Sequence, residues 1–260
     1  MYVIAISNEK GGTGKSTTAL NVASALAERG HRTLLVDLDP SYGLTRMLGA
    51  DAADFEVTVR EVLRADHDAT VRQATQGAKH VSSNLFFVPG HPDLAVIETM
   101  RRGEIRWPWI VKEALDEVAE AYEFAVLDCP PGVAFFPINA YVAADLLLIP
   151  IQSEYIALTS LPKIGEVLAE IPADARPGTY LVLPTMYDGR TKHAQEFMNM
   201  LKEQHPENLS KHIIKRTVGI SDSSIAGKPF IHYDHDHEAS CAYRGVAEEI
   251  IHEWQGREQA

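Results

Sequence analysis

The chain has 260 residues, 45% of them hydrophobic, and a formal net charge of -12. This length and apolar content suit one α/β domain, and no run approaches the ~20 apolar residues that cross a bilayer. An acidic chain binds nucleic acid or anionic membrane only through a local basic patch. The two cysteines, Cys129 and Cys241, lie far apart, which argues against a disulfide framework and fits a reducing cytosol.

Apolar runs that predict strands alternate along the chain with periodic patterns that predict helices. In chain order we expect strand Tyr2–Ile6, helix Ser16–Arg29, strand Thr33–Val36, strand Leu85–Val88, helix Trp109–Ala121, strand Phe124–Leu127, strand Leu146–Ile149, helix Tyr155–Glu170, strand Tyr180–Leu183 and helix Cys241–Trp254. This alternation predicts a single α/β domain with a twisted, mostly parallel sheet flanked by helices on both faces. Ligands bind such sheets at the carboxyl ends of the strands, so the loops there form the candidate site.

The loop after the first expected strand has the composition of a phosphate-binding loop. Its glycines let successive main-chain N–H groups turn toward phosphate oxygens, and the helix that begins near Ser16 adds its positive dipole end. Lys15 would contact the β- and γ-phosphates of ATP, and the Ser16 hydroxyl would bind Mg²⁺. The residues expected to bind the nucleotide are Lys10, Gly11, Gly12, Thr13, Gly14, Lys15, Ser16 and Thr17.

Acidic residues follow two other expected strands. Asp37 and Asp39 come after Thr33–Val36, and Asp128 comes after Phe124–Leu127. P-loop enzymes use carboxylates to orient the attacking water and to complete the Mg²⁺ shell. We expect Asp39 to orient the water and Asp128 to face Mg²⁺ as the Walker B acid. Asp37 would support either Mg²⁺ or the geometry of the loop.

The spelling Lys-Gly-Gly-x-Gly-Lys-Ser of residues 10–16 resembles the deviant Walker A motif of the ParA/MinD family of P-loop NTPases. An ordinary P-loop has glycine where this chain has Glu9. Other segments also resemble ParA, namely Asp37–Pro40, Asp128–Gly132, Ile149–Leu158, Pro184–Thr191 (a ParA loop near the adenine) and Gly227–Pro229. Two positions depart from the family pattern: Ser41 replaces a glutamine, and Gly219 replaces an arginine implicated in DNA binding.

The resemblance implies a ParA-like ATPase domain over residues 1–260 with no N-terminal DNA-binding domain. In that family the first lysine of the loop, here Lys10, crosses the interface of an ATP-sandwiched homodimer to touch the nucleotide of the second subunit. We therefore expect Lys10, Lys15 and Asp39 to be the catalytic residues of a weak intrinsic ATPase. A cation delivered by a second subunit can accelerate phosphoryl transfer by roughly 10³–10⁵-fold.

The resemblance also implies the partners and the location of the protein. ParA dimers bind double-stranded DNA non-specifically, a ParB-like or cargo-adaptor protein stimulates hydrolysis, and the cycle moves DNA or other cargo. The protein would then be cytoplasmic and associated with the nucleoid. The expected DNA patch is the basic island Lys211, Lys215, Arg216 and Lys228. A second candidate patch contains Arg101, Arg102, Arg106 and Lys112.

Two other functions remain open. A MinD-like regulator that cycles on the membrane needs a basic amphipathic helix at its C-terminus. Residues 248–260 are acidic, which disfavours anionic lipid, so we expect no membrane partner. A metabolic ligase or amidase could use the same phosphate loop with a small second substrate, but the match to ParA beyond that loop disfavours this function.

Overall fold

The computed structural model describes residues 1–64, 69–77, 82–153, 160–175 and 177–258. Six parallel strands form the centre of the sheet, and a short strand, β3 (Gln76–Gly77), pairs antiparallel with β4 at one edge. The strand order is β3-β4-β2-β5-β1-β6-β7. The parallel strands are β1 (Tyr2–Ile6), β2 (Thr33–Asp37), β4 (Leu85–Val88), β5 (Phe124–Asp128), β6 (Leu146–Gln152) and β7 (Thr179–Thr185). The predicted α/β class with a mostly parallel sheet is confirmed.

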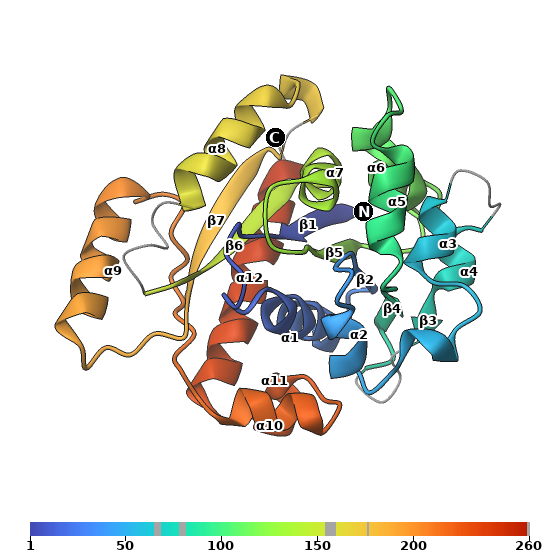
Figure 1. Cartoon of the computed structure of the whole chain (residues 1–260). Coiled ribbons are helices and arrows are strands. Elements are labelled where there is room, and N and C mark those ends of the chain that lie inside the picture. The colour runs from blue at the N-terminus through green and yellow to red at the C-terminus, as the bar shows by residue number, and fades with distance from the viewer. Residues whose placement is uncertain (65–68, 78–81, 154–159, 176, 259–260) are drawn as a thin grey trace.

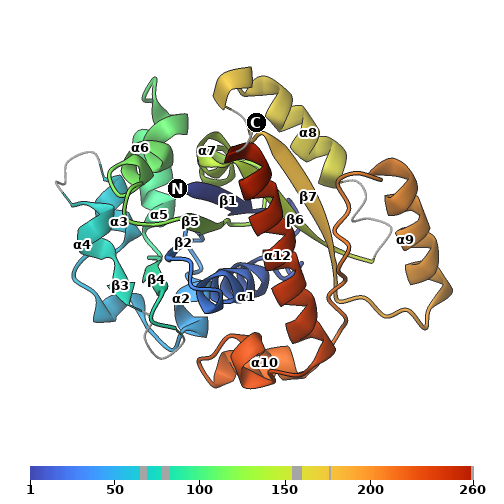
Figure 2. The same cartoon turned by 180° about the vertical axis from the view of Figure 1, so that it is seen from behind.

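Helices cover both faces of this sheet, with α1 on one side of the strands and α7 on the other (Figure 1). The helices are α1 (Lys15–Glu28), α2 (Gly43–Met47), α3 (Val59–Leu63), α4 (Val71–Ala74), α5 (Leu94–Arg101), α6 (Ile110–Asp116), α7 (Phe135–Ala143), α8 (Ser160–Glu170), α9 (Lys192–Gln204), α10 (Gly219–Ile225), α11 (Phe230–Tyr233) and α12 (Glu238–Glu258). Seen from behind, α12 lies in the foreground and runs past α1 (Figure 2).

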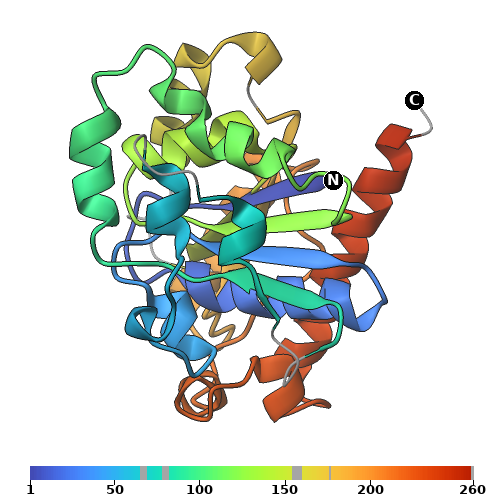
Figure 3. The ribbon, with the colours of Figure 1, turned by 90° about the vertical axis from the view of Figure 1, so that its right-hand side faces the viewer.

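Two apolar layers hold the helices against the sheet, because successive strand side chains point to opposite faces. The layer under α1 and α12 contains the strand residues Ile4, Leu35, Val126 and Leu148, and the layer under α5 to α7 contains Val3, Leu34, Leu127 and Ile149. The end of α12 returns to the neighbourhood of the N-terminus, where β1 begins (Figure 3). There the Arg257 guanidinium lies 5.5 Å from the centre of the Tyr2 ring.

Two strands extend past the prolines at which we expected them to end. Strand β6 continues through Pro150 to Gln152, and β7 continues through Pro184 to Thr185. Strand β6 pairs with β1 only as far as Leu148, so beyond that point it has a neighbour on one side alone. Strand β7 is the edge of the sheet. Proline has no N–H group, so a strand tolerates it where that side of the strand has no neighbouring strand to bond.

The helices differ from the predictions at several places. The expected helix Trp109–Ala121 is a 3₁₀ turn followed by α6, and beyond Asp116 the amides bond three residues back, as Val118 does to Leu115. Helix α7 is absent from the expected helices because eight of its nine residues are buried, so it has no polar face to reveal a helical period. Residues 154–159 of the expected helix Tyr155–Glu170 lie outside the described residues.

Candidate functional site

The phosphate loop joins β1 to α1 at the carboxyl edge of the sheet. Gly12 and Gly14 have φ angles of 75° and 86°, a left-handed conformation that residues with a Cβ adopt only with strain. Gly14 immediately precedes the first turn of α1. Lys15 folds back across the loop, and its Nζ donates a hydrogen bond to the carbonyl oxygen of Lys10 at 3.0 Å. The loop therefore holds a buried lysine side chain against its own main chain.

Distant strands hold this loop in place through two side chains. Gln152, at the end of β6, donates to the carbonyl oxygen of Gly12 at 2.6 Å and contacts the Met186 sulfur at 2.8 Å. Thr185, at the end of β7, donates its hydroxyl to the carbonyl oxygen of Thr13 at 2.9 Å. The motif does not reveal the two bonds to the loop carbonyls, because each joins residues more than 130 positions apart.

A buried pair of carboxylates lies behind the loop. Strands β2 and β5 pair in register, so Asp37 and Asp128 are direct neighbours. Both carboxylate oxygens of Asp128 are buried and have no hydrogen-bond partner among the described residues. Burial raises the pKa of Asp128 well above its usual value, the charge of Asp37 raises it further, and Ser16 and Lys15 oppose the rise. Buried oxygens without donors are costly unless a cation binds them, so Asp128 beside Ser16 fits Mg²⁺.

The contacts of Asp37 are different. Its Oδ2 accepts hydrogen bonds from the Thr45 amide at 2.9 Å and from the Thr45 hydroxyl at 2.7 Å, and its Oδ1 accepts from the Asp39 amide at 3.2 Å. Burial raises the pKa of Asp37 to about 7, and the bonds from Thr45 oppose this rise. Of the two roles left open for Asp37, these contacts favour control of the loop geometry. A direct role on Mg²⁺ stays a prediction.

Asp39 lies on the same edge of the sheet as the phosphate loop. Its Oδ1 accepts a hydrogen bond from the Ser41 amide at 2.8 Å, which orients the carboxylate. Its charge acts on both Lys15 and Asp128, so the structure brings these three predicted residues together. The Lys10 amide is held by the Asn8 side chain at 2.9 Å. The roles of Asp39 on water and of Lys10 in a second subunit stay predictions.

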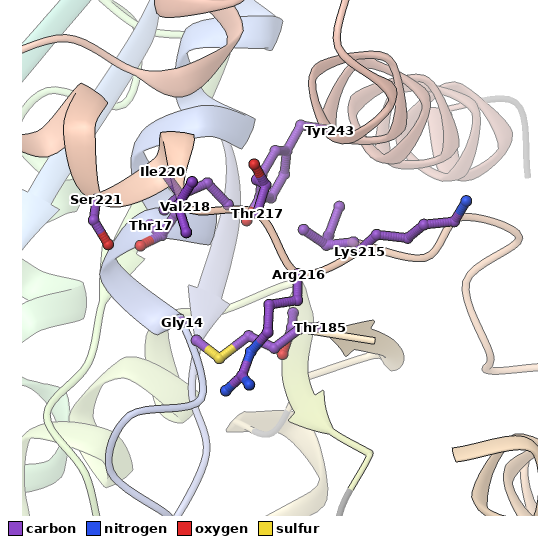
Figure 4. Close-up of a pocket in the computed structure, with 12 residues that line it drawn as sticks. Gly14, Thr17, Thr185, Lys215, Arg216, Thr217, Val218, Ile220, Ser221 and Tyr243 are labelled. Atoms are coloured by element: carbon purple, nitrogen blue, oxygen red, sulfur yellow. The ribbon is translucent and has the colours of Figure 1, made fainter. Parts of the chain in front are cut away.

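A pocket of about 400 Å³ opens beside the loop (Figure 4). Its lining combines threonine and serine hydroxyls with apolar side chains, as small-molecule sites commonly do. The lining residues are Gly14, Thr17, Thr185, Met186, Ile214, Lys215, Arg216, Thr217, Val218, Ile220, Ser221 and Tyr243. The segment Pro184–Thr191, which the resemblance associates with adenine, contributes two of them. The pocket therefore has the position and the size for the nucleoside of a nucleotide held by the loop.

Basic side chains gather next to this pocket. Lys215 and Arg216 also line a second, polar cavity of about 470 Å³, to which Arg190 contributes as well. In Figure 4 the Lys215 side chain points away from Gly14, whereas the Arg216 side chain lies on the Gly14 side. Acids oppose two of these cations: Glu238 pairs with Lys215 at 2.6 Å, and Asp188 pairs with Arg190 at 2.6 Å.

Only part of the predicted basic island is therefore assembled at one place. Lys211 and Lys228 are exposed but do not line this cavity, whereas Arg190 does and was not among the expected residues. The signal for Arg190 was its place in the loop that follows β7, at the carboxyl edge of the sheet. In the second candidate patch each of the four cations is paired with an acid. The pairs are Arg101–Glu104, Arg102–Glu98, Arg106–Glu113 and Lys112–Asp116. That patch is a charge-balanced surface.

A glycine-rich loop at the carboxyl edge of a parallel sheet, a buried lysine within it and an acid at the end of the neighbouring strand define a P-loop nucleotide hydrolase. Residues 1–178 match the family described as AAA domain (AAA_31). The chain is 34% identical to the sporulation initiation inhibitor protein Soj of Bacillus subtilis, over 95% of this chain and 97% of that protein. It is also 34% identical to the chromosome-partitioning ATPase Soj of Thermus thermophilus, over 95% of this chain and 94% of that protein. The chain belongs to the ParA/Soj family of P-loop ATPases.

A solved structure extends the comparison. Cobyrinic acid a,c-diamide synthase from Mycobacterium smegmatis, with a bound ATP analogue and magnesium, superposes with a TM-score of 0.83 at 28% identity. The match covers 98% of this chain and 96% of that one. Within the described ranges of the present chain, no helix is long and apolar enough to cross a membrane.

Proposed function

We propose that this protein is a Mg²⁺-dependent ATPase that positions DNA or another cargo through a nucleotide-controlled homodimer. Binding of Mg-ATP would bring two subunits together and enable non-specific binding to double-stranded DNA. A ParB-like or cargo-adaptor protein would stimulate hydrolysis and return the subunits to the unbound state. The observation that carries this proposal is the combination of Lys10 and Lys15 in one phosphate loop with the buried carboxylate of Asp128 behind it.

Phosphoryl transfer depends on positioning the reacting groups and on neutralising the phosphate charge, and each residue of the site would have one of these roles. The loop amides and Lys15 would hold the β- and γ-phosphates. Ser16 and Asp128 would hold Mg²⁺, which neutralises charge on the phosphate oxygens when bound. Asp39, oriented by the Ser41 amide, would align the attacking water. Lys10 of the second subunit would add a positive charge in the transition state, so hydrolysis would require the dimer.

DNA binding is the least obvious part of this cycle, because a dimer doubles a net charge of -12. Arg190, Lys215 and Arg216 line one polar cavity, and phosphates would compete with Asp188 and Glu238 for two of these cations. Phosphate contacts release counterions, so the affinity should fall steeply with salt. DNA binding by this acidic chain would depend on this local cluster.

Retardation of random duplex DNA by the ATP-loaded protein tests this assignment. Each lost phosphate contact should weaken binding and lower the salt slope by about 1. We expect Arg190→Ala/Arg216→Ala to reduce affinity roughly tenfold or more at low salt. The matched control is Arg102→Ala/Arg106→Ala, which removes two exposed arginines that do not line this cavity. Failure of the wild-type protein to retard DNA at low salt would refute the DNA-binding role.

A small-molecule enzyme is the second candidate, and the superposition on cobyrinic acid a,c-diamide synthase favours it. The two roles differ in what stimulates ATP turnover. A cargo-positioning ATPase should respond to DNA together with its partner protein and ignore cobyrinic acid. Turnover that required cobyrinic acid and was indifferent to DNA would establish the enzyme instead.

A MinD-like membrane cycle has little support from α12. Ile250 of this helix is fully buried, and Trp254 packs edge-on against Phe124, with ring centres 4.9 Å apart. These apolar residues of α12 are engaged with the sheet, so they are not available to a bilayer. Flotation with anionic liposomes in the presence of Mg-ATP should leave the protein in the soluble fraction.

A further inference from the structure

Glu9 places a carboxylate in the phosphate loop, next to Lys10. A negative charge at this place opposes the binding of a triphosphate. The backbone of Glu9 is tied down, because its carbonyl oxygen accepts a hydrogen bond from the Gly132 amide at 2.9 Å. Its side chain is only 28% exposed, so the carboxylate stays close to the loop. The chain therefore needs a positive charge near Glu9 if the loop is to accept nucleotide well.

Helix α8 supplies that charge. The Lys163 ammonium group donates a hydrogen bond to Glu9 Oε1 and forms an ion pair with it across 154 positions of sequence. The next residue, Ile164, is 2% exposed and belongs to the same apolar layer as Val3 and Ile149. Because Ile164 anchors the helix on the sheet, Lys163 is presented to the loop from a fixed support.

Lys15, the buried lysine of the loop, has other partners. The Lys15 Nζ donates to the carbonyl oxygen of Lys10 at 3.0 Å, and the largest charge acting on it is that of Asp128. Its positive charge therefore interacts with the carboxylates behind the loop. The described structure places Lys163, from a different element, on the Glu9 carboxylate.

We propose that Lys163 is a nucleotide-positioning residue, which neutralises Glu9 so that the phosphate loop can accept the triphosphate. This inference rests on the proposed ATP site. Lys163 takes no part in the transfer step, and it acts on phosphate affinity only through Glu9. The ligand class that depends on it is a phosphorylated nucleoside, with a dependence that grows with the number of phosphate charges.

The size of the effect follows from charge interactions near a surface. Charges about 10 Å apart are within the screening length at about 0.1 M salt and are largely screened at about 1 M. Removing one compensating charge should weaken Mg-ATP binding roughly three- to tenfold at low salt. Because the interaction scales with the charge of the ligand, the loss should be largest for ATP, smaller for ADP and smallest for AMP.

Titration calorimetry of the full chain with Mg-ATP, Mg-ADP and AMP tests the proposal. The variants are Lys163→Met, Glu9→Gln and the double substitution, each measured at about 20 mM and about 500 mM salt. Lys163→Met should lose affinity roughly three- to tenfold at the lower salt, and the double variant should recover to within about twofold of wild type. The matched control is Lys112→Met, which breaks an exposed ion pair with Asp116 and should bind Mg-ATP normally.

Two results would overturn the proposal. One is unchanged Mg-ATP affinity in Lys163→Met. The other is a loss in Lys163→Met that Glu9→Gln does not repair, because this would mean that the lysine supports α8 itself. A recovery in the double variant cannot come from a purely structural role of Lys163. A wild-type protein that binds no Mg-ATP would instead refute the proposed function, and this outcome is visible before any variant is compared.

Discussion

Asp128→Asn should stabilise the protein in the absence of metal and nucleotide while impairing its use of Mg-ATP. Both oxygens of Asp128 are buried without a hydrogen-bond partner among the described residues, and Asp37 is its neighbour across β2 and β5. Keeping two acids in such a place costs stability, because the charged form of each is poorly solvated. Asparagine has nearly the same shape and removes one ionisable group.

The direction and the size of the stability change follow from the raised pKa values of the two acids. Burial raises the pKa of both acids, so the folded protein binds more protons than the unfolded chain between their ordinary values and the raised ones. The two acids therefore do not destabilise the fold below about pH 4, where both are protonated. The free energy of unfolding falls as the pH rises toward 7, the raised pKa of Asp37. Because the pKa of Asp37 rises from its ordinary 3.8 to about 7, keeping its charged form buried lowers the free energy of unfolding by at most about 4 kcal/mol.

For Asp128→Asn we expect a smaller gain, about 1–3 kcal/mol near pH 7.5 and close to zero near pH 4.5, because the asparagine amide is itself left with unmet hydrogen bonds. Urea unfolding of the metal-free protein at both pH values measures the gain. Mg-ATP should stabilise the wild type strongly and the variant much less, because the variant has lost the acid expected to face Mg²⁺.

A matched control is Asp188→Asn, which alters an exposed acid. The hydrogen bond from Arg190 lowers the pKa of Asp188 to about 2, so this variant should not gain stability as the pH rises. Equal stability of Asp128→Asn and wild type near pH 7.5, or a gain of the same size near pH 4.5, would refute the reasoning.

Three further predictions concern the loop geometry and the dimer. A Cβ at Gly90 would lie 2.7 Å from the Asp37 carboxyl carbon, so Gly90→Ala should cost about 2–4 kcal/mol in urea unfolding. Gly30→Ala, at a φ of 95° with no atom within 4 Å, should cost only about 1 kcal/mol, and equal costs would contradict the steric argument. Asp39→Ala should bind Mg-ATP, hydrolyse it far more slowly and accumulate as a dimer in light scattering; a monomer would argue against the water-orienting role. Lys10→Ala should bind Mg-ATP in calorimetry yet stay monomeric. A normal dimer with normal turnover would refute the role of Lys10 at the nucleotide of the second subunit.

The fold class was predictable because its signals are local. Each buried strand is a short apolar run, and the helices with polar faces show their period directly. The places where the predictions differ from the structure are also physical. We expected two strands to end before Pro150 and Pro184, but each strand continues past its proline. Whether a strand tolerates a proline depends on which neighbouring strands it pairs with, and the sequence does not show this. The apolar helix α7 lacks a polar face, because it is enclosed on all sides.

The charge pattern shows where prediction from sequence ends. Arg102 and Lys215 look alike in the sequence, as basic residues within basic segments. In the structure Arg102 pairs with Glu98 one helical turn away. Lys215 pairs instead with Glu238 from a distant segment and lines a cavity beside Arg216. Arg190 joins that cavity from a loop 25 positions earlier. A count of charges along the chain cannot distinguish these surroundings, because charges from distant segments decide the local potential.

The sequence by itself determined the phosphate loop and the acids that face it. Glycines that accept positive φ angles lie between an apolar strand and a helix, and parallel strands necessarily bring their carboxyl ends to one edge. Only the tertiary structure decided which groups tune that site: Gln152 on the loop carbonyl, Lys163 on Glu9, and Thr45 on Asp37. The physical reason is that hydrogen bonds and ion pairs depend on separations of a few ångströms, and packing alone brings such distant residues together.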